Sequence, residues 1–135
     1  MTRAPDLDPA REQRLVDQAA KSRANAVSKR SGFSVGAAIE DGDGRIWGGC
    51  NVENSTYGLT VCAERVAIWK ALSEGVRSFR AVAVVTGADA PTPPCGACRQ
   101  ILWEFAGDVP IVSATAGGAR KRWRLSEIFP EPFDF

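Results

Sequence analysis

The chain has 135 residues, carries a net charge of +1, and is 44% apolar. This length can bury one sizeable hydrophobic core, which predicts a single domain over residues 1–135. The near-zero net charge gives no general electrostatic reason to expect a nucleic acid or an anionic membrane as a partner. Since no stretch approaches the ~20 apolar residues of a membrane span and the polar start is unlike a secretory signal, we expect a cytoplasmic location.

Helix and strand signals follow one another along the chain. Asp8 and Pro9 are typical of a helix N-terminus, and about residues 1–8 ahead of that helix are expected to be flexible. A continuous apolar run at 81–85 predicts a central strand that is covered on both faces. The order of elements predicts an α/β layered domain. The expected helices span about 9–29, 61–74, 94–107 and 125–129, and the expected strands span about 33–39, 45–53, 81–85, 109–114 and 122–125.

The absence of histidine restricts the possible chemistry. It excludes a Ser-His-Asp triad, a Cys-His nucleophile pair and a His-ligated zinc ion. In a cytosolic chain with a Cys-x-x-Cys pair, the four cysteines favour metal or redox ligands over disulfides. Cys62 begins one expected helix, and Cys95 and Cys98 begin the next. Because helix N-termini favour thiolate over thiol, these three cysteines are candidate ligands of one Zn²⁺ ion.

Three protein ligands leave one position on the metal for water, which is the arrangement of a catalytic zinc site. Glu64 follows Cys62 by two residues, so the first turn of the helix is expected to bring its carboxylate beside that water. Glu64 is therefore the candidate proton shuttle. Three thiolates on Zn²⁺ make a negative site, and Arg65 is the candidate that compensates this charge and tunes the metal.

Two motifs in the chain resemble those of the small homotetrameric cytidine deaminases. They are Cys-Ala-Glu-Arg at 62–65 and Pro-Cys-Gly-Ala-Cys-Arg-Gln at 94–100, within a resemblance over about residues 12–133. The resemblance implies a three-layer α/β/α fold with a mixed five-stranded sheet flanked by helices, and one zinc ion per subunit. It implies hydrolytic deamination of cytidine and 2′-deoxycytidine in pyrimidine salvage, with Glu64 as the acid and base.

The resemblance also implies roles in substrate binding. Asn51 and Glu53 resemble the pair that holds the ribose, and their spacing places both on one face of a strand. Phe33 resembles the aromatic residue that stacks on the pyrimidine. The backbone of Ala63 resembles the amide that contacts the base.

In such tetramers each active site takes residues from neighbouring subunits. Tyr57 and Phe133 match those shared positions. The resemblance therefore implies a homotetramer, a small nucleoside as the substrate, and a monomer of low activity.

The segment before Ser31 departs from the family pattern Tyr-x-Pro-Tyr-Ser, because the residues here are Val-Ser-Lys-Arg-Ser. Lys29 and Arg30 therefore leave a different aminopyrimidine substrate open, such as a blasticidin-type compound or a base-modified cytidine. Alternatively, Lys29 and Arg30 lie at the solvent-exposed C-terminal end of a helix, where positive charges interact favourably with the helix dipole.

Other interpretations of the motifs also stay open. Cys50 could complete a structural four-cysteine zinc site, and Cys95 with Cys98 could form a redox pair. The chain could instead be a nonenzymatic interaction domain stabilised by zinc. The basic run at 120–124 invites a nucleic-acid interpretation, but such runs are more often a solvated face or a subunit contact, so we expect no nucleic acid.

Overall fold

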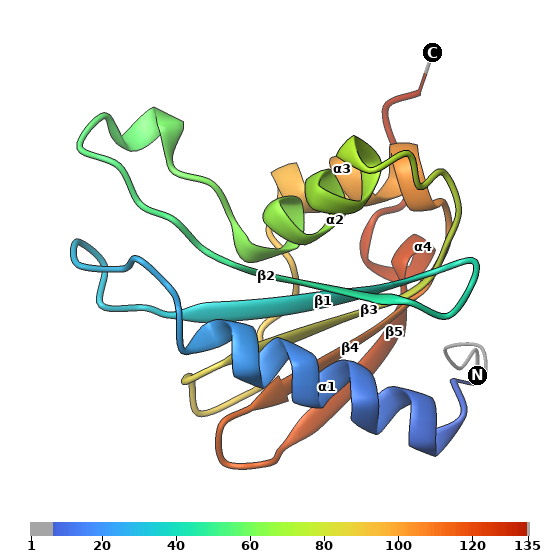
Figure 1. Cartoon of the computed structure of the whole chain (residues 1–135), viewed down its shortest axis with the longest axis horizontal. Coiled ribbons are helices and arrows are strands. Elements are labelled where there is room, and N and C mark those ends of the chain that lie inside the picture. The colour runs from blue at the N-terminus through green and yellow to red at the C-terminus, as the bar shows by residue number, and fades with distance from the viewer. Residues whose placement is uncertain (1–6, 135) are drawn as a thin grey trace.

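The computed structural model describes residues 7–134, which form one mixed sheet with helices on both faces (Figure 1). The strand order is β2-β1-β3-β4-β5, in which β3 and β4 are parallel and the other neighbours are antiparallel. This architecture confirms the expected mixed five-stranded sheet flanked by helices. The elements are α1 (Pro9–Arg23), β1 (Val35–Asp41), β2 (Ile46–Cys50), η1 (Tyr57–Leu59), α2 (Ala63–Ser73), β3 (Phe79–Thr86), α3 (Gly96–Ala106), β4 (Pro110–Thr115), β5 (Arg120–Arg124) and α4 (Leu125–Ile128).

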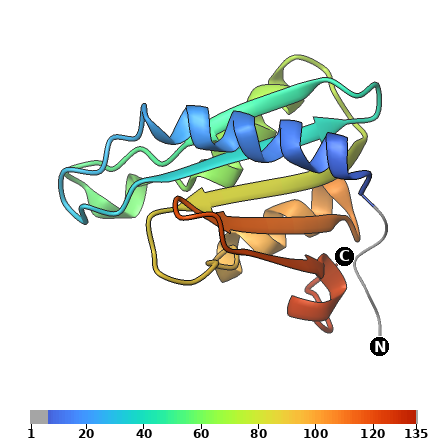
Figure 2. The ribbon, with the colours of Figure 1, turned by 90° about the horizontal axis from the view of Figure 1, so that it is seen from below.

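Alternation along the strands builds a hydrophobic core on each face of the sheet. In β3, Val82 and Val84 belong to the core that contains residues of α2, α3 and α4. Ala81 and Ala83 belong to the core beneath α1. Successive strand residues point to opposite faces, so the apolar run of β3 serves both cores, as a central strand requires. Figure 2 shows α1 crossing the sheet on the face away from α2 and α3.

The first helix is shorter than its hydrophobic spacing predicts, and the expected end near Lys29 is wrong. It ends at Arg23, and the N–H of Ala24 closes the last turn. The backbone of Val27 instead joins the segment after β2: its N–H donates to Asn51 O at 3.0 Å, and its carbonyl accepts from Glu53 N at 2.9 Å. Tertiary pairing therefore overrides local helical spacing and brings residues 27–34 beside 51–55.

Local signals correctly predict the start of α1. The side chain of Asp8 accepts a hydrogen bond from Ala10 N, and Pro9 occupies the first turn. Residues 1–6 of the segment expected to be flexible lie outside the described residues. The short helix η1 was not predicted from the sequence. Across residues 7–134, the helices are too short or too polar to cross a bilayer.

Three strand ends lie side by side at one edge of the sheet, next to the starts of α2 and α3. Val35 at the start of β1 pairs with Thr86 at the end of β3, while Gly36 pairs with Cys50 at the end of β2. In doubly wound sheets, ligands bind where the chain leaves the carboxyl ends of the strands. Here α2 and α3 begin at this edge.

Candidate active site

Three cysteines from separate stretches of the chain come together at the starts of α2 and α3. The sulfur atoms of Cys62, Cys95 and Cys98 lie within 4.8 Å of one another, and those of Cys62 and Cys95 are 3.8 Å apart. Two sulfur atoms that are each about 2.3 Å from a tetrahedral zinc ion are about 3.8 Å apart. The separation of the Cys62 and Cys95 sulfur atoms therefore matches that of two zinc ligands, and all three sulfur atoms are close enough together to bind one Zn²⁺ ion.

Helix starts position these ligands. Cys62 and Cys95 are the N-cap residues of α2 and α3, and Cys98 lies in the first turn of α3. Cys98 is fully buried, whereas Cys95 is exposed. Among residues 7–134 the group of possible metal ligands consists of these three, and Cys50 on β2 is not part of it. A site of three protein ligands leaves room for water.

The charges around the cluster favour a thiolate at Cys62. A hydrogen bond from Cys98 and then one from Arg65 lower the pKa of Cys62 to about 5. The same hydrogen bond and burial raise the pKa of Cys98. Arg65 Nη2 lies 3.2 Å from Cys62 Sγ, while its buried Nε has no hydrogen-bond partner in the described structure. Arg65 therefore lies where the sequence places a compensating cation.

Glu64 lies in the first turn of α2, next to Cys62, and is 6% exposed. Burial is the main cause that raises the pKa of Glu64 to about 7; the nearby Cys62 thiolate also raises it, while a backbone hydrogen bond and Arg65 oppose the rise. Its side chain lines the same cavity as Cys62 and Cys95. A carboxyl group in this position can hold a proton beside the three cysteines and release it.

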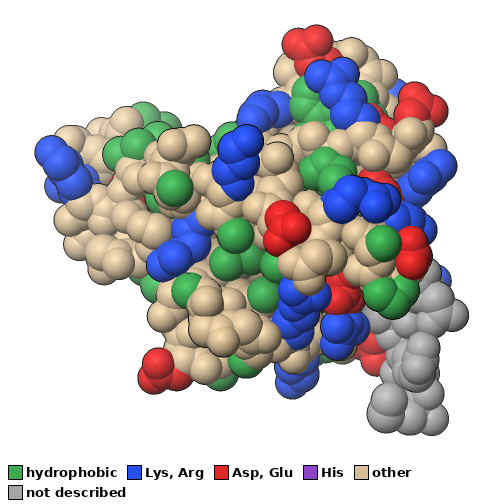
Figure 3. Space-filling model, turned by 60° about the horizontal axis from the view of Figure 1, so that its bottom comes forward, with side chains coloured by type: hydrophobic (Ala, Val, Ile, Leu, Met, Phe, Trp, Pro, Cys, Tyr) green, Lys and Arg blue, Asp and Glu red, His purple; other side chains and the backbone are tan. Residues whose placement is uncertain are grey.

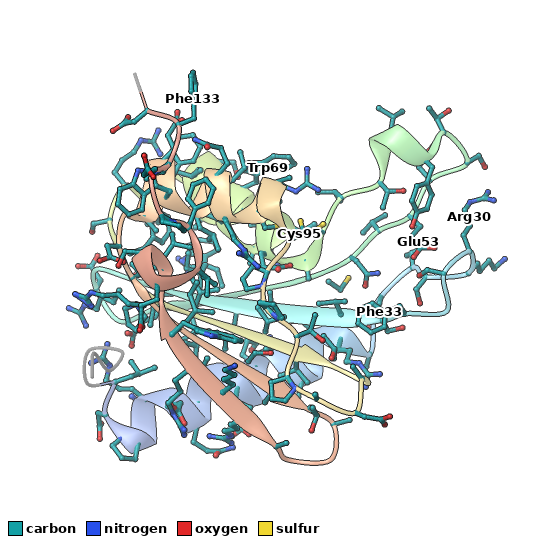
Figure 4. All side chains as sticks on the ribbon, turned by 180° about the vertical axis from the view of Figure 1, so that it is seen from behind. Arg30, Phe33, Glu53, Trp69, Cys95 and Phe133 are labelled. Atoms are coloured by element: carbon teal, nitrogen blue, oxygen red, sulfur yellow. The ribbon has the colours of Figure 1, made fainter. Side chains whose placement is uncertain are left out.

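The cavity in front of the cluster has a volume of about 240 Å³. Ligand pockets for drug-sized molecules span about 300–1,000 Å³, so this one suits a small molecule. Figure 4 shows Cys95 toward one side of the site, and Phe33 and Glu53 on the other. The lining residues are Ser31, Phe33, Val35, Asn51, Glu53, Tyr57, Thr60, Val61, Cys62, Ala63, Glu64, Val84, Thr86, Thr92, Pro93 and Cys95.

Asn51 is fixed at the edge of the sheet by its own amide group. Its Nδ2 donates to Phe33 O at 2.9 Å, and its Oδ1 accepts from Val35 N at 2.9 Å. Asn51 is buried. Each end of the amide retains one further hydrogen-bonding position for a ligand.

Glu53 is oriented by Arg30 and Ser31, at the end of the segment that precedes Phe33. Its carboxylate accepts from Arg30 N at 2.9 Å, from Ser31 N at 3.1 Å and from the Ser31 hydroxyl. The hydroxyl of Ser31, followed by these N–H groups, lowers the pKa of Glu53. This role of Ser31 was not among the predictions from the sequence. The local signal for it was the Ser-Gly turn, in which Ser31 Oγ also accepts a hydrogen bond from Phe33 N at 3.0 Å.

Three other predicted site residues lie in different surroundings. Ala63, at the start of α2, lines the cavity and is fully buried. Tyr57 in η1 lines the cavity of its own chain and remains 57% exposed. Phe133 is 68% exposed, points outward in Figure 4, and is not among the described residues that line the cavity. The sharing of Tyr57 and Phe133 between subunits stays a prediction.

Ion pairs within the chain engage most of the basic run at 120–124. Arg120 and Arg122 bond to Glu12 on α1, at 2.9 Å and 2.6 Å. Arg124 pairs with Asp108 at 3.0 Å. On the face drawn in Figure 3, Lys and Arg side chains are scattered among acidic and apolar ones. This arrangement favours the structural interpretation of the run over a nucleic-acid interface.

Comparisons with known proteins agree with this site. The family model of the cytidine and deoxycytidylate deaminase zinc-binding region matches residues 9–114. Cytidine deaminase from Sporosarcina psychrophila is 43% identical over 122 residues, which are 90% of each chain. Blasticidin-S deaminase from Bacillus cereus is 30% identical over 104 residues, 71% of this chain and 74% of that protein. The crystal structure of cytidine deaminase from Burkholderia pseudomallei superposes with a TM-score of 0.87 at 39% identity, covering 90% of this chain and 98% of that one. The chain therefore belongs to the zinc-binding cytidine and deoxycytidylate deaminase family.

Proposed function

We propose that the protein catalyses the hydrolytic deamination of cytidine and 2′-deoxycytidine to uridine and 2′-deoxyuridine, with release of ammonia, in pyrimidine salvage. One observation carries the proposal: a single cavity joins Cys62, Cys95 and Glu64 at one end to Asn51 and Glu53 at the other. A zinc ion held by Cys62, Cys95 and Cys98 would supply a Lewis acid that lowers the pKa of water.

Glu64 is the proposed proton carrier. Its carboxylate accepts a proton from the attacking water and passes it to ring N3, which makes C4 electrophilic. After hydroxide has added at C4, Glu64 takes the proton of the new C4 hydroxyl and delivers it to the amine. The C4–N bond then breaks, so that ammonia leaves and the carbonyl of the uracil ring remains. The burial of Glu64 among cavity residues supports this role, because it keeps bulk water away from the proton transfers.

The other end of the cavity suits a ribose. An ionised carboxylate has about four lone-pair sites. Glu53 already accepts three hydrogen bonds, so it retains a position for a sugar hydroxyl, while Asn51 retains one donor and one acceptor. Between the two ends, the side chain of Phe33 and the backbone of Ala63 line the cavity where the pyrimidine would lie.

Ordinary cytosine nucleosides are the favoured substrates over a blasticidin-type or base-modified compound. Lys29 and Arg30 are exposed and are not among the described residues that line the cavity. The guanidinium of Arg30 donates to Ser55 Oγ at 2.7 Å instead. The backbone N–H of Arg30 helps to orient Glu53, and the side chains of Lys29 and Arg30 add no charge to the described lining of the cavity.

An ultraviolet assay of the zinc-loaded protein tests the proposal. The panel is cytidine, 2′-deoxycytidine, 5-methylcytidine and blasticidin S, with ammonia measured in parallel. Glu64→Gln keeps the shape of the side chain but cannot carry the proton, so it should retain zinc and lose about 10²–10⁴-fold in kcat. Zinc-loaded protein without turnover of any cytosine nucleoside would favour a nonenzymatic zinc domain instead. Full activity in Glu64→Gln would refute Glu64 as the proton carrier.

We further propose a homotetramer in the cytoplasm, where thiolate ligands stay reduced. Large apolar side chains at the surface support self-association: Tyr57 is 57%, Leu59 69% and Phe133 68% exposed. Light scattering should give the mass of four chains. A fully active monomer would contradict the proposal that Tyr57 and Phe133 complete the sites of neighbouring subunits.

A further inference from the structure

The segment that carries Cys95 into the site has little backbone support of its own. Residues 87–95 join β3 to α3, and Pro91, Pro93 and Pro94 in this segment have no N–H to donate. Cys95 at its end is the exposed ligand of the cluster, whereas Cys98 is held in the buried first turn of α3. One backbone bond, from Arg99 N to Cys95 O at 2.9 Å, holds the end of the segment at α3. Side chains from outside hold the rest, such as Ser113 Oγ, which donates to Thr92 O at 2.7 Å.

Arg99 provides such a contact immediately beside the ligand. Its Nε donates to Pro94 O at 2.7 Å, the carbonyl of the residue just before Cys95. The same guanidinium donates through Nη1 to the carbonyl of Ile128 at the end of α4. Because the guanidinium is planar and rigid, one side chain with two bonds fixes the Pro94 carbonyl relative to α4.

The far end of this bridge is firmly packed. Leu125 of α4 is fully buried, and Ile128 packs against the same hydrophobic core as α2 and α3. Pro94 is itself buried. The carbonyl before Cys95 is thus tied to a packed helix that contributes none of the three cysteine ligands.

We propose that Arg99 is a positioning residue for the zinc site, which holds Cys95 through the Pro94 carbonyl so that the three sulfur atoms are arranged before the metal binds. This inference rests on the zinc site of the proposed function. Groups that orient metal ligands without touching the metal typically contribute about 10–100-fold to metal affinity. A residue that only fastened α4 would lower stability and leave zinc affinity unchanged.

The chain offers a matched control in the next residue. Gln100 Nε2 donates to Phe133 O at 3.0 Å, so it also connects α3 to the C-terminal segment, but it does not contact Pro94 in the described hydrogen bonds. Arg99→Met keeps the aliphatic length and removes both donors. Gln100→Ala removes only the contact to the C-terminal segment.

The test measures zinc dissociation constants by competition with a chromophoric chelator, with circular dichroism to verify that each variant is folded. We expect Arg99→Met to bind zinc about 10–100-fold more weakly, and its Co²⁺-substituted form to show an altered thiolate-to-metal absorption band. Gln100→Ala should match the wild type in both. Wild-type affinity in Arg99→Met, or an equal loss in both variants, would overturn the proposal.

If metal-free Arg99→Met does not fold, the rate of zinc release from the zinc-loaded protein replaces the equilibrium measurement. Faster release than from Gln100→Ala supports the proposal, and equal release refutes it. The readout is independent of turnover. A protein that binds zinc but deaminates nothing would contradict the proposed function and leave this comparison intact.

Discussion

The replacement Gly49→Ala tests how β2 positions the start of α2. A methyl group on Gly49 would lie 2.6 Å from Ala63 O, 2.6 Å from Ala67 N and 3.1 Å from Ala67 Cα. All three are backbone atoms of α2, which cannot rotate away as a flexible side chain would. Added methyl groups in packed cores cost about 1–3 kcal/mol, and a clash with backbone on this scale belongs at the upper end, about 3 kcal/mol.

The consequence extends to the site, because Ala63 stands between Cys62 and Glu64. Relief of the clash has to move the first turn of α2 away from β2, and with it the metal ligand and the proton carrier. We expect Gly49→Ala to lose about 3 kcal/mol in urea unfolding and to bind less than one zinc per chain.

Gly58→Ala is the matched control, since a Cβ at Gly58 meets nothing within 4 Å. It should unfold within about 0.5 kcal/mol of the wild type and keep its zinc. If Gly49→Ala is equally neutral and retains full zinc content, the close approach of β2 and α2 does not position the site.

Three further predictions concern the metal and the ion pairs. Cys95→Ser should lose zinc while Cys50→Ser retains it, as measured by elemental analysis; loss in both would favour a four-cysteine site. Chelation of the metal should lower the melting temperature by about 10 °C, because a ligand at 100 times its Kd stabilises the folded state by about 2.7 kcal/mol. Added zinc should restore the melting temperature, and an unchanged melting temperature after chelation would exclude metal-linked stability. Glu12→Gln should cost about 1–3 kcal/mol at pH 7, since it weakens the bonds to Arg122 and Arg120 that lower the pKa of the buried Glu12. That stability is fully present above the unfolded-state pKa of about 4.3 and is lost as the pH falls through the lower folded-state pKa, so the difference in unfolding free energy between the variants should vanish in acid; a difference independent of pH would refute it.

Local patterns in the sequence predicted the parts of the site that depend on short-range geometry. Cys62, Cys95 and Cys98 were identified from their places at helix starts, and the structure brings them together in the predicted way. Glu64 follows from the same local geometry, because it occupies the first turn after a ligand. Its chemical role, and those of Asn51 and Glu53, stay predictions.

Contacts between distant segments could not be predicted in the same way. The helical spacing of residues 24–29 is real, but backbone pairing of Val27 with 51–53 ends the helix at Arg23. The cations of β5 looked free in the sequence, yet Glu12 lies 110 positions away from Arg122 and bonds to it. No local sequence pattern around Arg122 or Glu12 predicts this pairing.

The sequence by itself determined the order of the main helices and strands from periodicity, and the candidate metal ligands from their places at helix starts. The family followed from the resemblance of the two cysteine motifs. Only the tertiary structure decided how the ends of the substrate cavity are held: Ser31 against Glu53, Asn51 between Phe33 and Val35, and Arg99 between Pro94 and Ile128. Such contacts join segments whose sequence separation carries no signal. A buried polar group such as the Asn51 amide needs a partner, and the folded chain determines which one is in reach.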